Sequence, residues 1–347
     1  MSAPRVLQIP ETCAWNDYVR LQESHLAALG IEVMRPGLCR DEPGFTAADV
    51  SRRVRDALLR DVPDIVHVHW PEMLGRLLGD AQALDLLRAM TARGARLVQT
   101  VHDLAPHEPG ANGTVSFIDA VDSLTHGVHF FTKEHEHLAR QIRGALPSPA
   151  LYLPHPRYPG LSPGAGGAAR RTTIGCFGRL RPYKRTAAFA EAFVRHATGD
   201  QRLLIAGYPD HPATHQVLTR LASAHEQVEY LPGFHPWPEF VRLLERVAWV
   251  ALPYRRVWSS GVLVAAAQTG CRILSPPPVG AEGYRTLLDG SAVLDPWDDD
   301  LAVRSWQRAV AAPPRPALST ATGAPDLPNW REAAEAFCGF YDEVLEA

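Results

Sequence analysis

Short runs of apolar residues alternate with amphipathic stretches along the first half of the chain. The runs predict strands at Val6–Ile9, Ile31–Met34, Asp64–His69, Arg96–His102 and Thr125–Phe131. Between them, apolar residues recur at helical spacing, as over 84–93 and 133–143. Regular alternation of strand and helix is typical of an α/β fold with a parallel, doubly wound sheet.

The same rhythm restarts in the second half. Predicted strands cover Thr173–Phe177, Arg202–Gly207, Val228–Gly233, Val247–Pro253, Arg272–Ser275 and Ser291–Leu294. Predicted helices cover Ala187–His196, Thr214–His225, Trp237–Arg246 and Val262–Thr269. Two such series in a chain of 347 residues predict two Rossmann-like domains.

Two segments with little to bury divide these series. Residues 154–171 are rich in proline, glycine and alanine and are expected to be a linker, while 313–328 are proline-rich and are expected to cross between domains. The first domain then covers 1–153 and the second 172–312. A final helix over 329–346, capped by Asn329, is expected to complete the first domain.

Composition narrows the class of protein. Apolar residues make up 46% of the chain and the net charge is −3, which argues against a general nucleic-acid binder. No apolar run approaches the roughly 18 residues of a transmembrane helix, and the N-terminus leads directly into a strand without a signal-peptide pattern. The five cysteines are scattered and predict neither disulfides nor a zinc site. We expect a cytoplasmic protein.

One amphipathic helix, predicted over Phe45–Val62, is basic. Its arginines, among them Arg52 and Arg60, favour either an ordinary solvated face or a face that rests on anionic lipid. Peripheral membrane contact is therefore an expectation alongside the cytoplasmic one.

Polar side chains follow two strands of the first half. His69 ends one strand, and Trp70, Pro71 and Glu72 are expected in its exit loop. His102 ends the next strand, and Asp103, His107 and Glu108 are expected in the loop that follows it. The carboxyl ends of parallel strands meet at one sheet edge, where ligands bind in open α/β folds. The two groups together predict a site.

Gly178 ends the first strand of the second half. Arg179, Arg181, Lys184 and Arg185 follow it, and a helix begins at Ala187. A glycine lets backbone approach a ligand, and cations with helix N–H groups can hold a diphosphate. The alternative is a plain strand–helix turn with solvated cations.

A metal site is not expected. Asp298–Asp300 superficially resembles an Asp-x-Asp metal motif, but it precedes a helix, and capping carboxylates explain it better. His67 and His69 share a strand face without a third ligand nearby in the sequence.

The order of these motifs resembles the GT-B glycosyltransferases, and in outline their glycogen-synthase-like, retaining branch. The stretches 67–72, 101–108, 181–184, 252–254 and 260–263 resemble a narrower group, the bacterial GDP-mannose:glycolipid 4-β-mannosyltransferases of xanthan-type polysaccharide assembly. Two glutamates of the retaining branch are replaced here by Trp258 and Ala266. Ribose recognition is therefore expected to differ.

The resemblance implies a GT-B fold with two Rossmann-like domains, an interdomain cleft and a C-terminal crossing helix. It also implies roles for particular residues. The expected catalytic residues are Asp103, Glu108 and His102. The donor diphosphate is expected to contact Arg179, Lys184, Ser259, Ser260 and Gly261, and the donor nucleotide and sugar are expected to contact Gly178, Tyr254, His107 and Glu282. The acceptor is expected to contact Trp70, Glu72 and Asn16. Ser260–Gly261 has the alternative of an ordinary N-cap, and Tyr254 that of core packing.

The expected reaction moves a sugar, mannose from GDP-mannose, to a hydroxyl of a lipid-linked or other glycoside, with inversion and without a metal or other cofactor. An inverting enzyme needs a general base, with Asp103 first and Glu108 second; in a retaining enzyme His102 would hydrogen-bond the donor sugar. The alternatives are a natural-product glycosyltransferase with another donor, a non-catalytic sugar-nucleotide-binding protein and a UDP-sugar epimerase.

Overall fold

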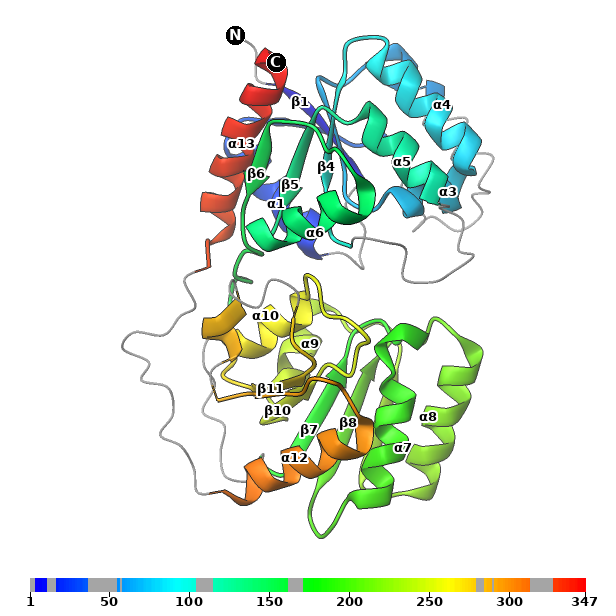
Figure 1. Cartoon of the computed structure of the whole chain (residues 1–347), viewed down its shortest axis with the longest axis vertical. Coiled ribbons are helices and arrows are strands. Elements are labelled where there is room, and N and C mark those ends of the chain that lie inside the picture. Colours follow the sequence, from blue (N-terminus) through cyan, green and yellow to red (C-terminus); the bar gives the residue numbers. More distant parts are fainter. Residues whose placement is uncertain are drawn as a thin grey trace. The chain divides into compact units, whose positions relative to one another are not determined.

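The computed structural model describes residues 4–10, 17–36, 55–56, 58–103, 115–161, 171–278, 284–288, 290–312 and 327–347. The chain forms two compact units. Figure 1 shows both, coloured along the sequence. Unit 1 comprises Met1–Pro156 together with Pro328–Ala347, and unit 2 comprises Arg157–Leu327.

Unit 1 is built on a six-stranded parallel sheet in the order β2-β1-β3-β4-β5-β6. Its strands are β1 (Arg5–Ile9), β2 (Glu32–Met34), β3 (Ile65–Val68), β4 (Arg96–Thr100), β5 (Gly127–Phe130) and β6 (Ala150–Tyr152). The strand order reverses between β1 and β3, and such a switch point opens a crevice at the carboxyl ends of the strands.

Helices cover both faces of this sheet. They are α1 (Asp17–Ala28), α3 (Pro71–Leu78), α4 (Asp80–Thr91), α5 (Val115–Leu124), α6 (Lys133–Arg143) and α13 (Trp330–Glu346). Successive side chains of β1 point to opposite faces of the sheet, so the strand contributes to a hydrophobic core on each face. Leu7 packs with the cluster under α3, α4 and α5, and Val6 packs with the cluster under α1 and α13.

The last helix, α13, returns to unit 1 and lies beside β6 in Figure 1. It begins with a capping box, in which the Asn329 side chain accepts from the N–H of Glu332 and the Glu332 carboxylate accepts from the N–H of Asn329. Gly127 on β5 makes its close approach possible, because a Cβ there would lie 2.5 Å from Val344 Cγ2 and 2.9 Å from Phe340 Cζ.

Unit 2 repeats the plan with a six-stranded parallel sheet in the order β12-β11-β10-β7-β8-β9. Its strands are β7 (Thr173–Phe177), β8 (Arg202–Gly207), β9 (Val228–Pro232), β10 (Trp249–Ala251), β11 (Arg272–Ser275) and β12 (Ala292–Val293). Its helices are α7 (Thr186–His196), α8 (Pro212–Ala224), α9 (Trp237–Leu244), α10 (Gly261–Gln268) and α12 (Asp299–Ala311), with short 3₁₀ turns η2 (Pro182–Lys184) and η3 (Arg285–Leu288). The switch point lies between β7 and β10, so the turn at Gly178 leaves the sheet beside the crevice.

The predicted alternation of strands and helices is confirmed, with one correction in the segment that follows β3. Pro71 and Glu72 were expected in a loop, but they form the first turn of α3. Proline is well suited to the first helical position, since its missing N–H would have no partner there.

The predicted basic helix over 45–62 lies mostly outside the described residues, Arg52 and Arg53 included. No helix among the described residues combines the length and apolarity that crossing a bilayer demands.

Candidate functional site

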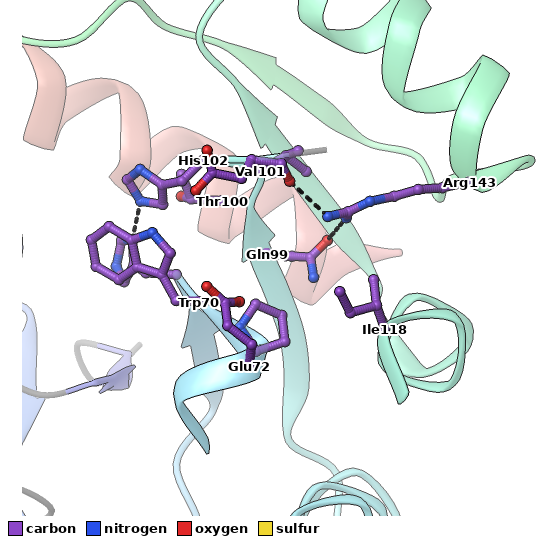
Figure 2. A pocket seen from close by; sticks show the side chains of 11 residues that line it. Trp70, Glu72, Gln99, Thr100, Val101, His102, Ile118 and Arg143 are labelled. Carbon is purple, nitrogen blue, oxygen red and sulfur yellow. Dashed lines mark hydrogen bonds between the residues drawn. The ribbon is translucent and has the colours of Figure 1, made fainter. Parts of the chain in front are cut away.

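A hollow in unit 1 opens at the carboxyl ends of β3 and β4. Four residues expected from the sequence line it together: Trp70, Glu72, His102 and Asp103 (Figure 2). The remaining lining residues are His69, Pro71, Gln99, Thr100, Val101, Ile118 and Arg143. The hollow thus carries two carboxylates, two imidazoles and a guanidinium beside an indole face.

His102 is buried in this hollow, with 8% of its surface exposed. Its ring stacks on Trp70, with the ring centroids 4.0 Å apart and the planes at 19°, and its other contacts include Tyr18 and Phe131. Burial, with the nearby histidines His69, His129 and His155, holds the pKa of His102 well below its ordinary value. The ring is therefore neutral at pH 7 and can accept or donate a hydrogen bond without carrying charge.

Arg143, at the end of α6, ties the floor of the hollow together. Its guanidinium donates to Gln99 Oε1 at 3.0 Å, to the Asp103 backbone carbonyl at 2.9 Å and to Asp122 Oδ1 at 3.4 Å. The Arg143 and Asp122 side chains are 6% and 7% exposed, so this is a buried ion pair. Burial raises the pKa of Asp122, and the charge of Arg143 opposes that rise. The contact with the Asp103 carbonyl fixes the backbone from which the candidate base projects.

Several sequence-predicted residues of this half cannot be placed. Asn16, His107 and Glu108 lie outside the described residues, as does Glu282 of the second half. Of the two candidate bases, Asp103 lines the described hollow and Glu108 lies outside the described residues.

In unit 2, the turn after β7 brings Gly178, Lys184 and α10 together. Gly178 has a φ of +93°, which favours glycine, and a Cβ there would lie 3.4 Å from Val262 Cγ2 and 3.9 Å from Lys184 Nζ. Val262 is in the first turn of α10, so the ammonium of Lys184 lies near the N-terminus of that helix. The ammonium also lies 4.7 Å from the centroid of the Tyr254 ring, within range of a cation–π contact.

Tyr254 is buried, 6% exposed, and burial raises its pKa well above the ordinary value. Its ring supports Lys184 and meets Tyr183 edge to face, with ring centroids 6.0 Å apart. Tyr254 is thus a core residue, as the alternative held, and its ring also contacts the candidate diphosphate-binding cation Lys184.

Ser260 caps α10, since its hydroxyl accepts from the N–H of Leu263 at 3.3 Å. This is the N-cap alternative considered for Ser260–Gly261. The cap leaves the first-turn N–H groups directed out of the helix end, and their partial positive charge adds to that of Lys184.

Arg179 has a partner that the sequence did not suggest. It forms a two-pronged contact with Asp210, with Nη2 at 2.9 Å from Oδ1 and Nε at 3.2 Å from both oxygens, and Arg181 Nε reaches Asp210 Oδ2 at 2.9 Å. Burial of Asp210 favours a raised pKa, but the two arginines outweigh it and the pKa of Asp210 is lowered. Arg185 is directed elsewhere, to Asp299 of α12 at 2.5 Å.

The aspartates at the start of α12 serve that helix. Asp298 caps it by accepting from the N–H of Leu301 at 2.7 Å, as predicted, while Asp299 pairs with Arg185 and Asp300 with Arg195. Within the described part of the chain, no group of three or more histidine, cysteine, aspartate or glutamate side chains is arranged to hold a metal ion.

Sequence reasoning missed Asp210 and Arg143. Asp210 follows the carboxyl end of β8, so the rule that drew attention to the other strand exits applied to it as well. Arg143 gave no local signal, because its partners Gln99 and Asp122 are 44 and 21 residues away along the chain.

Two curated proteins resemble the chain in sequence, although no protein-family model matches it. Both are GDP-mannose:glycolipid 4-beta-D-mannosyltransferases of Xanthomonas campestris pv. campestris, 26% identical over 238 residues and 27% identical over 241 residues. Each alignment covers 64% of this chain and 64% of the relative, so the chain spans somewhat less than two thirds of their length.

Solved structures match the chain over nearly its whole length. Sucrose-phosphate synthase from Thermosynechococcus elongatus has a TM-score of 0.67 at 13% identity and covers 99% of this chain and 95% of its own. Anabaena HepE in complex with UDP and glucose has a TM-score of 0.62 at 14% identity, covering 99% and 98%. AviGT4, a glycosyltransferase involved in avilamycin A biosynthesis, has a TM-score of 0.59 at 18% identity, covering 99% and 98%. The chain has the GT-B fold of these proteins, and that prediction is confirmed.

Proposed function

We propose that this protein is a glycosyltransferase that uses a nucleotide-sugar donor. The observation that carries the proposal is the convergence of the Lys184 ammonium, the N-terminus of α10 and the open backbone of Gly178 at the switch point of unit 2. Solved structures of the same fold, HepE with UDP and HepE with UDP-glucose, support a nucleotide-sugar donor.

The chemistry at this convergence is stabilisation of the leaving group. When the glycosidic bond to the donor breaks, negative charge accumulates on the nucleoside diphosphate. In this proposal Lys184 and the N–H groups of Ser259, Ser260 and Gly261 would meet that charge, and removal of one such donor typically lowers kcat by roughly 10²- to 10³-fold. Arg179 would add to this stabilisation once the incoming diphosphate competes with Asp210 for its guanidinium.

Unit 1 would supply the acceptor half of the reaction. An inverting transfer requires a base for the acceptor hydroxyl, and Asp103 is the first candidate because Arg143 fixes its backbone at the hollow. Glu108 remains the second candidate by sequence. Trp70 offers an aromatic face for a sugar ring, and Glu72 an acceptor for its hydroxyls.

GDP-mannose as the donor and a lipid-linked glycoside as the acceptor are the finer part of the proposal. They are supported by the names of the two Xanthomonas relatives. With a lipid-linked acceptor, the protein would work in the cytoplasm at the membrane surface, where the basic segment Phe45–Val62 would meet anionic headgroups.

A ligand panel tests the donor half first. GDP, UDP, ADP and dTDP, each with and without EDTA, are compared by thermal shift on the wild type and on Arg179→Ala and Lys184→Ala. A ligand at about 100 times its Kd adds roughly 2.7 kcal/mol of stability. We expect a GDP-selective shift that survives EDTA and is lost in Lys184→Ala; no shift with any nucleotide would contradict the proposal.

Acceptor class then separates the main proposal from its closest rival. The full-length likeness to AviGT4 favours a natural-product glycosyltransferase as the second candidate. Transfer of radiolabelled mannose from GDP-mannose to lipid-extractable glycoside supports the main proposal. Turnover of the donor without any acceptor would instead indicate an epimerase.

A further inference from the structure

Arg185, the residue directly after Lys184, has a strained backbone. Its φ of +55° and ψ of +19° place it in the left-handed region, and in the described part of the chain it is the one residue other than glycine with a positive φ. A Cβ makes this conformation unfavourable, whereas glycine adopts it readily. Residues held in such conformations are frequent at functional sites. The proposed reaction gives the Arg185 side chain no role, so an arginine at this position needs an explanation.

The backbone of Arg185 joins two elements of unit 2. Its N–H donates to the Pro182 carbonyl at 3.0 Å and closes η2, and its carbonyl accepts from the N–H of Phe189 at 3.0 Å and begins α7. Lys184 is the last residue of η2. The φ and ψ of residue 185 therefore set the direction in which Lys184 leaves the turn relative to α7.

The Arg185 side chain is anchored on α12. Its Nη2 lies 2.5 Å from Oδ2 of Asp299, and the two side chains are 35% and 11% exposed. The other oxygen of Asp299 accepts from Trp297 Nε1 at 2.8 Å, so both carboxylate oxygens have a donor. The Trp297 ring in turn contacts Phe189 of α7, with ring centroids 6.4 Å apart. Asp299 is thus a fixed partner for the guanidinium of Arg185.

We propose that Arg185 and Asp299 are positioning residues for Lys184. Their ion pair holds residue 185 in the left-handed conformation, and this conformation directs the Lys184 ammonium to the Tyr254 ring, 4.7 Å away. The consequence for catalysis rests on the proposed function, because it requires a diphosphate at Lys184. The positioning itself rests only on contacts within unit 2.

Joining α12 to α7 does not by itself explain the strained residue. The neighbouring pair, Asp300 with Arg195, already links the same two helices, and Arg195 lies within the regular last turn of α7. A partly exposed ion pair such as that of Arg185 also stabilises a fold only slightly. What distinguishes the pair of Asp299 with Arg185 is its place directly after Lys184.

Lysine NMR tests the positioning without any substrate, because the chain contains two lysines, Lys133 and Lys184. Protein labelled with ¹³C,¹⁵N-lysine gives two sets of side-chain signals, which are assigned by the loss of one set in Lys133→Gln. The ring current of Tyr254 should displace the Lys184 signals upfield. Lys133 lies over the Tyr152 ring in unit 1, at 5.7 Å, and is the internal reference.

Two substitutions remove the ion pair from opposite sides. Arg185→Gly permits the left-handed backbone but has no side chain to anchor, and Asp299→Asn keeps an oxygen for Trp297 but loses the charge. In both variants we expect the Lys184 signals to lose their upfield displacement while the Lys133 signals stay unchanged. If Arg185→Gly fails to fold, Arg185→Asn replaces it, because asparagine also tolerates the left-handed region.

Asp300→Asn is the matched control, since it breaks the neighbouring ion pair on α12 and should leave both lysines unaffected. Unchanged Lys184 signals in Asp299→Asn would overturn the proposal. This holds even if Arg185→Gly alters them, because glycine would then act through backbone flexibility and not through the ion pair. An equal change in Asp300→Asn would also overturn it, because the effect would then belong to α12 as a whole.

Kinetics then test the consequence for the reaction. A displaced cation should lower kcat/KM for the sugar donor by roughly 10- to 100-fold in Asp299→Asn. The double variant Arg185→Gly with Asp299→Asn should lose no more than the single variants, because both remove one contact. Unchanged kcat/KM alongside altered Lys184 signals would refute the catalytic part. If the wild type binds no nucleotide and turns over no sugar nucleotide, the proposed function fails, while the NMR result still decides the positioning role.

Discussion

Lys184 is a single cation whose position depends on a glycine and a tyrosine. Gly178 leaves room for the ammonium, and the Tyr254 ring supports it from 4.7 Å. A larger side chain at 178 would be strained by the φ of +93° as well as crowded by Val262. The cation is thus positioned by its surroundings and is not merely carried by a long flexible side chain.

Lys184→Met should separate charge from packing at this position. Methionine keeps most of the apolar length but removes the ammonium, so we expect kcat/KM for the nucleotide-sugar donor to fall by roughly 10²-fold or more. The urea midpoint should change little. Arg195→Met, which removes an exposed cation paired with Asp300 on the far part of α7, is the matched control and should leave both kinetics and stability unaffected. Equal losses in the two variants would argue against a specific role for Lys184.

The buried histidines show why the residue scale is hardest to predict from sequence. His67 meets Tyr341 across 274 positions of the chain, and His69 meets Gln8 across 61. The two-residue spacing correctly predicted that His67 and His69 share a strand face, and their rings stack with centroids 4.3 Å apart. Their partners, however, depend on strand register and on the return of α13, which no local pattern encodes.

At the scale of elements, α6 and β4 are joined by Arg143 beneath the hollow. Arg143→Met would leave Asp122 as a buried charge without its ion-pair partner and release the Asp103 carbonyl. Breaking a buried pair in this way destabilises by about 3–5 kcal/mol, which urea unfolding would detect. Arg140→Met, on the same helix but in a partly exposed pair with Glu136, should lose no more than about 1 kcal/mol.

A double variant checks the cause of that loss. Arg143→Met combined with Asp122→Asn removes the stranded charge and should recover part of the stability. If the double variant is as unstable as the sum of its parts, the loss comes from packing and not from the ion pair.

The seating of α13 on β5 depends on Gly127. Gly127→Ala would force Val344 and Phe340 aside, and overpacking of this kind typically costs about 1–3 kcal/mol. Gly339, on α13 itself, has nothing within 4 Å of the position of a Cβ, so Gly339→Ala should stabilise the helix by up to about 1 kcal/mol. Calorimetry on the two alanine variants gives opposite changes in Tm if this account is right. A gain in Tm for Gly127→Ala would show that α13 adjusts freely.

Elements were the most predictable level of this molecule. The helix Lys133–Arg143 and the strands Thr173–Phe177, Arg202–Gly207 and Arg272–Ser275 have the predicted bounds, because each combines a clear period with glycine, proline or a cap at its ends. The prediction of a loop at Pro71 was wrong, because Pro71 begins α3. The site was predictable where it follows strand ends, but not where Arg143 or Asp210 completes it from a distance.

For the whole molecule, the buried histidines predict a loss of stability in mild acid. Burial lowers the pKa of His69 to about 3 and, as the largest effect on each, those of His129 and His155 to about 4, against 6.5 for an ordinary histidine. Below pH 6.5 the unfolded chain therefore binds more protons than the folded one. Stability is complete above that pH and falls as the pH drops towards 4, by about 2 kcal/mol per histidine at pH 5.

Urea unfolding at pH 7.5 and pH 5 measures this effect. His155→Phe should reduce the difference between the two pH values by about 2 kcal/mol, because one of the titrating rings is gone. His137→Gln should leave the difference unchanged, because His137 is exposed. A pH dependence that is identical in wild type and His155→Phe would mean that His155 is protonated, or accessible, in the folded protein.

The return of α13 to unit 1 also bears on how the protein is made. The ribosome delivers β1–β6 first and α13 only after all of unit 2, yet α13 supplies Phe337, Phe340 and Val344 to a core of unit 1 and the Tyr341 hydroxyl to a hydrogen bond with His67. Until α13 emerges, one face of the first sheet lacks part of its cover and His67 lacks its Tyr341 partner. The core of the first unit is therefore completed only after the whole of the second unit has been synthesised.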